Sequence, residues 1–206
     1  MTIVPYPEDC LSARKWTQAG GRLEKQRSSF TGHGPELDFG AAARWQCECT
    51  PVLFEDDAQR DAFEAFEAAC QLPGAMFRLP AVLADQRRGD ETLPASCTVN
   101  GAGNSGRQLS VSGLTPSVRN LPAGKKITVV LPNGDEQLIR LAADLVADGS
   151  GNGTATLATP LRRTPAAGAL VELALPWALM RATHDPGWSE EPGPIFTHAM
   201  SCEEAF

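Results

Sequence analysis

The chain has 206 residues, which is enough for one large domain or two small domains, each with its own core. It carries 18 Lys and Arg against 25 Asp and Glu, and this net charge of -7 argues against a general nucleic-acid binder, whose affinity comes from basic side chains meeting phosphates. Glycine (19) and proline (16) are abundant and aromatic residues make up only 6%, a composition typical of a turn-rich β protein rather than a helix bundle.

The amino terminus, MTIVPYPEDC, shows no basic region followed by an apolar core, and no apolar run approaches the ~18 to 20 residues of a membrane span. We therefore expect no export signal, no membrane insertion and synthesis in the cytosol. Disulfide frameworks are typical of small secreted domains, so the scattered cysteines are expected to be free thiols. They are Cys10, Cys47, Cys49, Cys70, Cys97 and Cys202.

The first part of the chain predicts two strands. One lies near residues 22–30 and is followed by a loop over residues 31–35. The second covers residues 41–50, where apolar and polar side chains alternate, as in a strand with one buried face. Pro51 is expected to end this strand. The residues of the buried face are Ala43, Trp45, Cys47 and Cys49.

A helical period replaces the alternation over about residues 56–72. Asp56, with Gln59 three residues later, resembles a capping box, and Pro73 and Gly74 are expected to stop the helix. We expect the aromatic pair Phe63 and Phe66 to pack in a core. The residues at helical spacing on the predicted inner face are Ala58, Ala62, Phe63, Phe66, Ala69 and Cys70.

Residues 98–176 form a series of short β-prone runs separated by glycine, proline and asparagine. Asn133-Gly134 between two of these runs is a strong hairpin signal. Short strands at this spacing, with no helical period between them, predict a small closed or nearly closed barrel. The predicted strands cover residues 108–112, 126–131, 137–145, 153–157 and 170–175.

The segments on either side of this barrel are each incomplete, and we expect them to join into one domain. A strand is predicted over residues 77–83, followed by a charged connector over residues 84–91. Beyond the barrel we expect a strand over 177–183, a turn over 184–187, a loop over 190–194 and a closing strand over 195–202. The predicted organisation is a β-rich domain, sandwich-like or barrel-like, of residues 1–92 and 177–206 with one helix, and an inserted barrel of the oligonucleotide-binding (OB) type over residues 93–176.

Two segments have the spacing of known ligand loops. Residues 101–106, GAGNSG, match a dinucleotide-binding glycine loop, but the following residues predict a strand and not the helix that such a loop needs. Asp148, Ser150 and Asn152 match the first half of a calcium loop, but Thr159 stands where a glutamate is needed. We favour a glycine-rich turn and a hairpin loop.

Other chemistry finds little support in the sequence. Cys47 and Cys49 point to the same face, and core packing is favoured over a metal site because no metal-type spacing links them to the remaining cysteines or to His33, His184 and His198. No Gly-x-Ser-x-Gly elbow is present. We therefore predict no catalytic, cofactor-binding or metal-binding residue, and no enzyme activity.

Five basic residues of the predicted barrel could form a patch that binds nucleic acid: Lys125, Lys126, Arg140, Arg162 and Arg163. No Phe, Tyr or Trp occurs between Thr98 and Pro176 for bases to stack on. We therefore expect no specific nucleic acid partner.

Several stretches together resemble one family. They are Trp45 before a short strand, DAQRDAFEAFEAACQLPGAMFRLP, VNGAGNSGRQLSVSGLTPSVRNLPAGKKITV, LIRLAADLVADGSGNGTATLATPLRRTPAAGALVEL and the ending SCEEAF. In these the chain is similar to the distal tail proteins of long-tailed siphophages and related prophages, in the form with an inserted OB-type barrel. The resemblance covers nearly the whole chain and its motifs are structural.

The resemblance implies an architectural role in the virion, at the tip of the tail, after assembly in the host cytoplasm. Proteins of this family typically form a six-membered ring that joins the tail tube to the hub and the receptor-binding apparatus of the baseplate. The expected partners are therefore other copies of the chain, the tail tube protein and the hub proteins, with host-surface carbohydrate as a further partner of the barrel. No cofactor and no membrane are implied.

Two alternatives belong to other classes of protein. A non-enzymatic module could bind carbohydrate or another ligand through the barrel, and an isolated barrel would then show ligand-dependent melting. An enzyme or metalloprotein built around the cysteines would carry zinc or iron after purification.

Overall fold

The computed structural model describes residues 2–7, 11–19, 22–24, 36–38, 43–53, 56–82, 93–94, 97–183 and 200–205. In these residues the protein is mainly β, with one α-helix, two six-stranded sheets and two smaller pairs of strands, which confirms the predicted fold class at this level. Internal contacts divide the chain into two compact units. The first unit is Met1–Ala19, Arg44–Leu79 and Leu179–Phe206, and the second is Gly20–Ala43 and Pro80–Ala178.

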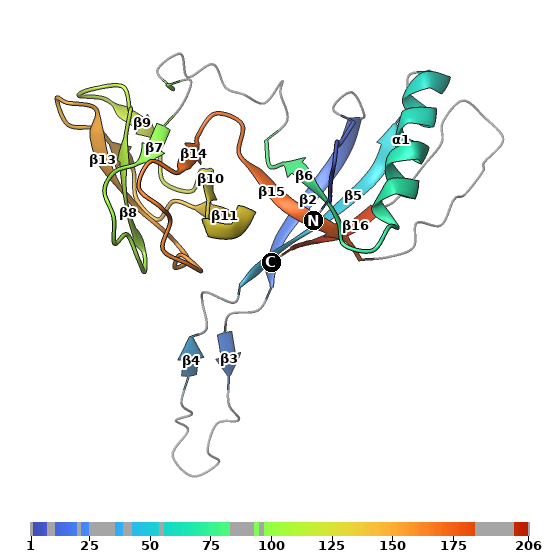
Figure 1. The fold of residues 1–206 in the computed structure, drawn as a ribbon, viewed down its shortest axis with the longest axis horizontal. Helices are drawn as coiled ribbons and strands as arrows, with labels where there is room; N and C mark the ends of the chain where they lie inside the picture. The colour runs from blue at the N-terminus through green and yellow to red at the C-terminus, as the bar shows by residue number, and fades with distance from the viewer. Residues whose placement is uncertain are drawn as a thin grey trace, which may run out of the picture. The chain divides into compact units, whose positions relative to one another are not determined.

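The sheet of the first unit takes strands from both ends of the chain (Figure 1). Its strands are β1 (Thr2–Val4), β2 (Leu11–Ala19), β5 (Arg44–Leu53), β6 (Ala75–Pro80), β15 (Trp177–Ala182) and β16 (Met200–Glu204). Their order is β1-β6-β15-β16-β5-β2, with β1 parallel to β6 and with β16 antiparallel to both β15 and β5. β16 therefore lies inside the sheet, and among the described strands β1 and β2 form its edges.

Helix α1 (Asp57–Cys70) begins where the sequence predicts. Asp56 is the N-cap, and its Oδ1 accepts a hydrogen bond of 2.8 Å from the Gln59 amide, as expected for a capping residue. The predicted inner face is partly wrong, because Ala58 and Ala62 are exposed. Aromatic contacts fix the direction of the helix instead, since small alanine side chains contribute little buried area compared with phenylalanine rings.

The buried side of α1 carries Phe63, Phe66 and Glu67. The Phe66 ring stands edge-on to Phe77 of β6, with ring centroids 5.1 Å apart, and edge-on to Tyr6 at 5.4 Å. These rings form the contact between the helix and the sheet of the first unit.

Strand β5 shows the predicted alternation, with Trp45, Cys47 and Cys49 buried and the residues between them exposed. The prediction that Pro51 ends the strand is wrong, since β5 runs to Leu53. Its pairing with β2 shifts register near Pro51. Ser12 pairs with Val52 and Arg14 pairs with Cys49, so Ala13 alone on β2 faces two residues of β5, Thr50 and Pro51. A proline lacks an N–H donor and is tolerated at such a bulge.

The sheet of the second unit contains β7 (Cys97–Val99), β8 (Gln108–Ser112), β10 (Lys126–Val130), β11 (Glu136–Arg140), β13 (Asn152–Thr156) and β14 (Leu170–Glu172). The order is β11-β10-β14-β7-β8-β13, and neighbouring strands are antiparallel. A separate pair joins β9 (Arg119–Leu121) to β12 (Leu145–Val146). Buried Ile127, Val129, Ile139 and Leu141 belong to one apolar core with residues from the other strands.

The predicted hairpin between β10 and β11 is confirmed. Val130 pairs with Glu136 across the short 3-10 turn η3 (Pro132–Gly134), and Asn133 and Gly134 both have positive φ angles, 67° and 78°. Asparagine and glycine adopt this backbone most easily, which explains the turn.

In the described residues β11 and β13 do not pair with each other and stand at the two ends of the second sheet. The strand pairing therefore does not show the closed barrel that the sequence predicted. The chain just beyond these two strands is nevertheless linked by a bridge between Leu141 and Leu157. At this bridge the Ala142 amide donates to the Thr156 carbonyl and the Ala158 amide to the Arg140 carbonyl, both at 2.8 Å.

Several predicted strand bounds change. The strand expected over residues 77–83 is β6, and the run over residues 137–145 is divided between β11 and β12. The strand expected to reach residue 175 ends at Glu172, because the Glu172 carboxylate accepts hydrogen bonds from the Ala174 and Leu175 amides and forms a turn.

Some predictions extend beyond the described residues. Of the strand near residues 22–30, only β3 (Arg22–Glu24) is described, paired with β4 (Glu36–Asp38). The following predicted segments lie outside the described residues: the loop over 31–35, the connector over 84–91, the turn over 184–187, the loop over 190–194 and the first part of the closing strand.

Gly151 provides a test of the tight loop before β13. Its φ is +78°, and an added Cβ would lie 2.7 Å from the Leu114 carbonyl oxygen, so alanine would strain the backbone and clash with it. We expect Gly151→Ala to lower the free energy of unfolding by about 2 kcal/mol. Gly149→Ala is the matched control, because its Cβ would meet only Ser117 Oγ at 4.0 Å. Urea denaturation of both variants measures the difference, and equal stability would contradict the assigned loop geometry.

Candidate functional site

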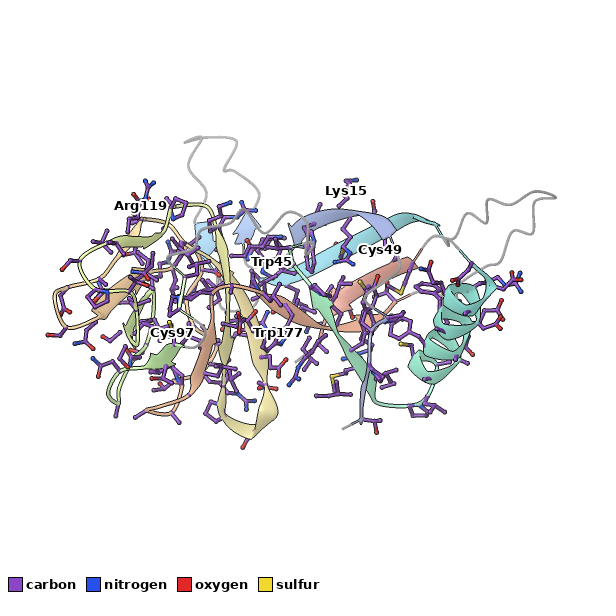
Figure 2. The ribbon with its side chains drawn as sticks, turned by 90° about the horizontal axis from the view of Figure 1, so that it is seen from above. Lys15, Trp45, Cys49, Cys97, Arg119 and Trp177 are labelled. Atoms are coloured by element: carbon purple, nitrogen blue, oxygen red, sulfur yellow. The ribbon has the colours of Figure 1, made fainter. Side chains whose placement is uncertain are left out.

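Three thiols meet on one face of the sheet of the first unit. Cys47 of β5 stands directly opposite Cys202 of β16, and Cys49 follows two residues along β5 on the same face. The Sγ atoms of Cys47 and Cys49 are 3.8 Å apart, and the Cys202 thiol donates to the Cys47 carbonyl oxygen at 3.4 Å. Figure 2 shows Cys49 among the side chains of this sheet. The sequence predicted that Cys47 and Cys49 share a face, but nothing local indicated the third member.

All three thiols are buried in the sheet. Cys47, Cys49 and Cys202 have exposed fractions of 1%, 0% and 2%. Side-chain hydrogen bonds with Cys47 and Cys49, followed by burial, raise the pKa of the Cys202 thiol. The hydrogen bond with Cys202 lowers the pKa of Cys47, but the contact with Cys49 and burial outweigh it and raise that pKa. The raised pKa values keep Cys47 and Cys202 as neutral thiols, and all three cysteines pack as small apolar side chains, as the sequence favoured.

A pocket of about 400 Å³ opens beside the C-terminal end of α1. Its wall combines apolar Phe66 and Met200 with charged Glu67 and Arg181. Glu67 is buried, although it was not among the residues of the predicted inner face of the helix. The lining residues Thr183 and Met200 border residues 184–199, which lie outside the described part of the chain. The pocket therefore supports no assignment of a ligand.

Cys70 lies on the wall of the same pocket. Burial, followed by the charge of Glu67, raises the pKa of this thiol to about 11. A thiol with a raised pKa is a poor nucleophile at neutral pH, because the thiolate is the reactive form. The arrangement therefore offers no activated cysteine at this position.

The glycine-rich segment over residues 101–106 forms a turn and not a phosphate-binding loop. Strand β8 follows it, where a nucleotide-binding loop would continue as a helix. Asn104 holds the turn: its Oδ1 accepts from the Ser110 amide at 2.8 Å, and its Nδ2 donates to the carbonyl oxygens of Asn100 and Gly101. The sequence preference for a turn is confirmed.

The calcium-like spacing falls in the loop before β13. Asp148 Oδ1 accepts hydrogen bonds from the Ser150 amide at 2.8 Å and the Asn152 amide at 2.9 Å. These bonds, with the Asn152 amide the largest contribution, lower the pKa of Asp148. The carboxylate thus supports the backbone of a hairpin loop, as the sequence favoured.

Acid is expected to weaken this loop. Because the pKa of Asp148 is lowered in the folded protein, its contribution to stability is present above the unfolded value of 3.8 and is lost as the pH falls through the lower folded value. Asp148→Asn keeps an oxygen acceptor but removes the charge, so the melting temperature of this variant should fall less steeply below about pH 4. Parallel acid-melting curves that stay a constant distance apart would contradict this role of the carboxylate.

The basic residues named in the sequence do not form one patch. Lys126 stands directly opposite Arg140 at one end of the β10–β11 pair. At the other end Arg163 forms an ion pair of 3.3 Å with Asp135, and the Arg162 amide donates to Gln137 Oε1 at 3.0 Å. Two groups of basic side chains, and not a continuous stripe, therefore flank this hairpin.

A buried polar network, which the sequence did not indicate, joins β10, β11 and Trp177. The Thr128 hydroxyl accepts from the Trp177 amide at 2.8 Å and donates to the Trp177 carbonyl at 2.5 Å. The indole Nε1 of Trp177 donates to the Glu136 carboxylate at 2.5 Å. Thr128 and Glu136 are almost fully buried, so these bonds stabilise the fold by satisfying buried polar atoms.

No protein-family model and no curated protein matched the chain. Among the described residues no group of three or more His, Cys, Asp or Glu side chains has a metal-binding arrangement. No helix in the described part of the chain has the length and apolar character to cross a membrane. The positions of His33, His184 and His198 lie outside the described residues.

Proposed function

We propose that the protein is a structural component of a phage tail tip, a distal tail adaptor whose copies form a ring between the tail tube and the hub. The observation that carries this proposal is the organisation of the chain. Strands from both flanks of the sequence share one sheet, with helix α1 packed through Phe66, while a second unit takes Pro80–Ala178 from between them together with Gly20–Ala43. This organisation agrees with what the resemblance to distal tail proteins implies.

The second unit fits an OB-like barrel in this proposal. Six antiparallel strands surround one apolar core, and the bridge between Leu141 and Leu157 links the two ends of their order. Closing a small sheet in this way removes its exposed edges. We therefore retain the barrel as part of the proposal.

The first sheet offers two different edges for assembly. β1 and β2 carry backbone N–H and C=O groups along the outer sides of the sheet, and β2 has nine residues. A ring of identical copies needs one heterologous contact, in which two different surfaces meet, repeated until the ring closes. Two unlike strand edges satisfy this requirement, and a ring of six copies is the number that the resemblance implies.

Deletion of the gene from the phage or prophage that carries it tests this function. We expect particles whose tails lack a tip and which do not infect, and we expect the full-length protein supplied in trans to restore both. Normal tails and normal infectivity without the gene would sink the proposal. The carbohydrate-binding module would then be tested by ligand-dependent melting of the whole protein.

A further inference from the structure

The pairing of β5 with β16 places two thiols where a disulfide can span the strands. Cys47 and Cys202 are direct partners in an antiparallel pair. The Cα atoms of such partners lie about 4.5 to 5.5 Å apart. This range falls within the roughly 4.4 to 6.8 Å that disulfides span.

Cys49 is less well placed for a disulfide with Cys47 or with Cys202. It is separated from Cys47 by two residues of extended chain, which corresponds to about 6.6 Å and so to the upper end of the disulfide range. Its direct partner on β16 is Met200 and not Cys202. The register therefore selects one pair from the three thiols.

We propose that Cys47 and Cys202 can be oxidised to a disulfide that joins β5 to β16. The oxidant is a small-molecule disulfide such as oxidised glutathione. One thiol attacks the small disulfide, forming a mixed disulfide and releasing one small thiol. The second thiol then attacks the mixed disulfide at the protein sulfur and releases the other small thiol. Both cysteine S–H bonds are lost, one S–S bond forms in the protein, and the two protons and two electrons are carried away by the two reduced small thiols.

Burial sets when this reaction occurs. The two sulfurs are nearly inaccessible in the folded sheet, and the thiolate needed for attack is disfavoured there. Oxidation therefore proceeds when β16 separates locally from β5, a fluctuation that exposes both thiols at once. Once formed, the bond joins positions 155 residues apart and keeps β16 in the sheet.

The bond is expected to stabilise the first unit. A cross-link across a long loop reduces the conformational freedom of the unfolded chain, and native geometry at this pair needs little backbone movement. We expect oxidation to raise the melting temperature by about 5 °C or more, and reduction with dithiothreitol to reverse this rise.

The test uses the full-length protein incubated with oxidised glutathione at temperatures rising to just below its melting midpoint. Remaining thiols are alkylated, and the unreduced protein is digested with trypsin and with a protease that cuts after Glu48, which separates Cys47 from Cys49. Mass spectrometry should show a peptide containing Cys47 joined to the peptide containing Cys202. The same link should form in Cys49→Ala and in Cys97→Ala, which changes a thiol of the second unit, and should disappear in Cys47→Ala.

Three results would overturn the proposal. The first is that Cys47 and Cys202 both stay reduced, and are therefore both alkylated, at every temperature of the range. The second is that Cys202 is joined to Cys49 in the wild type. The third is that glutathione stays attached to Cys47 or Cys202 without an internal link forming. If Cys47→Ala fails to fold, Cys47→Ser serves as the same test.

Discussion

Replacing Phe66 by alanine is expected to lower the free energy of unfolding by about 3 to 5 kcal/mol. Phe66 is 4% exposed and its ring lies within 6 Å, between centroids, of Tyr6, Phe63 and Phe77. Removing the ring leaves a cavity between α1 and the sheet and deletes three aromatic contacts, each of which adds about 0.5 to 1.5 kcal/mol beyond buried area. Chemical denaturation followed by circular dichroism measures the loss.

A matched control for Phe66→Ala is Leu72→Ala. This change also truncates a large apolar side chain, two residues beyond the end of the same helix, but Leu72 is 62% exposed. Its effect should stay within about 0.5 kcal/mol, as for most surface substitutions. Equal effects of the two changes would contradict the packing of α1 on the sheet through Phe66.

Replacing Thr128 by valine is expected to lower the free energy of unfolding by about 2 to 3 kcal/mol. The two side chains have nearly the same shape, so the change removes mainly the hydroxyl, which bonds both the amide and the carbonyl of Trp177. Each lost hydrogen bond accounts for about 0.5 to 1.5 kcal/mol, and polar backbone groups that lose a buried partner add to the cost. Thermal and urea unfolding of the purified variant measure it.

Thr128→Ser is the matched control because it keeps the hydroxyl and removes only a methyl group. We expect it to retain most of the stability that Thr128→Val loses. A serine variant as unstable as the valine variant would show that the methyl group, and not the hydrogen bonds to Trp177, accounts for the role of this position.

Local signals predicted the elements whose structure depends on neighbouring residues. Asp56 and Gln59 marked the start of α1, and Asn133-Gly134 marked the β10–β11 hairpin. Alternation of apolar side chains identified the buried face of β5. In each case the deciding interaction spans only a few residues, so the residue types alone were sufficient.

Features that depend on distant residues were not predictable in the same way. Pro51 remains inside β5 because the pairing with β2 forms a bulge there, and a local pattern does not contain that pairing. Glu67 is buried although the apolar pattern did not place it on the inner face of the helix. The thiol cluster likewise requires the register of β16 on β5, which brings Cys202 to Cys47.

The central proposal, a distal tail adaptor, is tested most directly by immunogold electron microscopy of particles released from cells that carry the gene. Antibody raised against the purified full-length protein marks its position, and particles from a strain that lacks the gene serve as the control. The proposal predicts gold confined to the far end of the tail. Unlabelled particles, with the antigen present only as free protein in the cells, would contradict it.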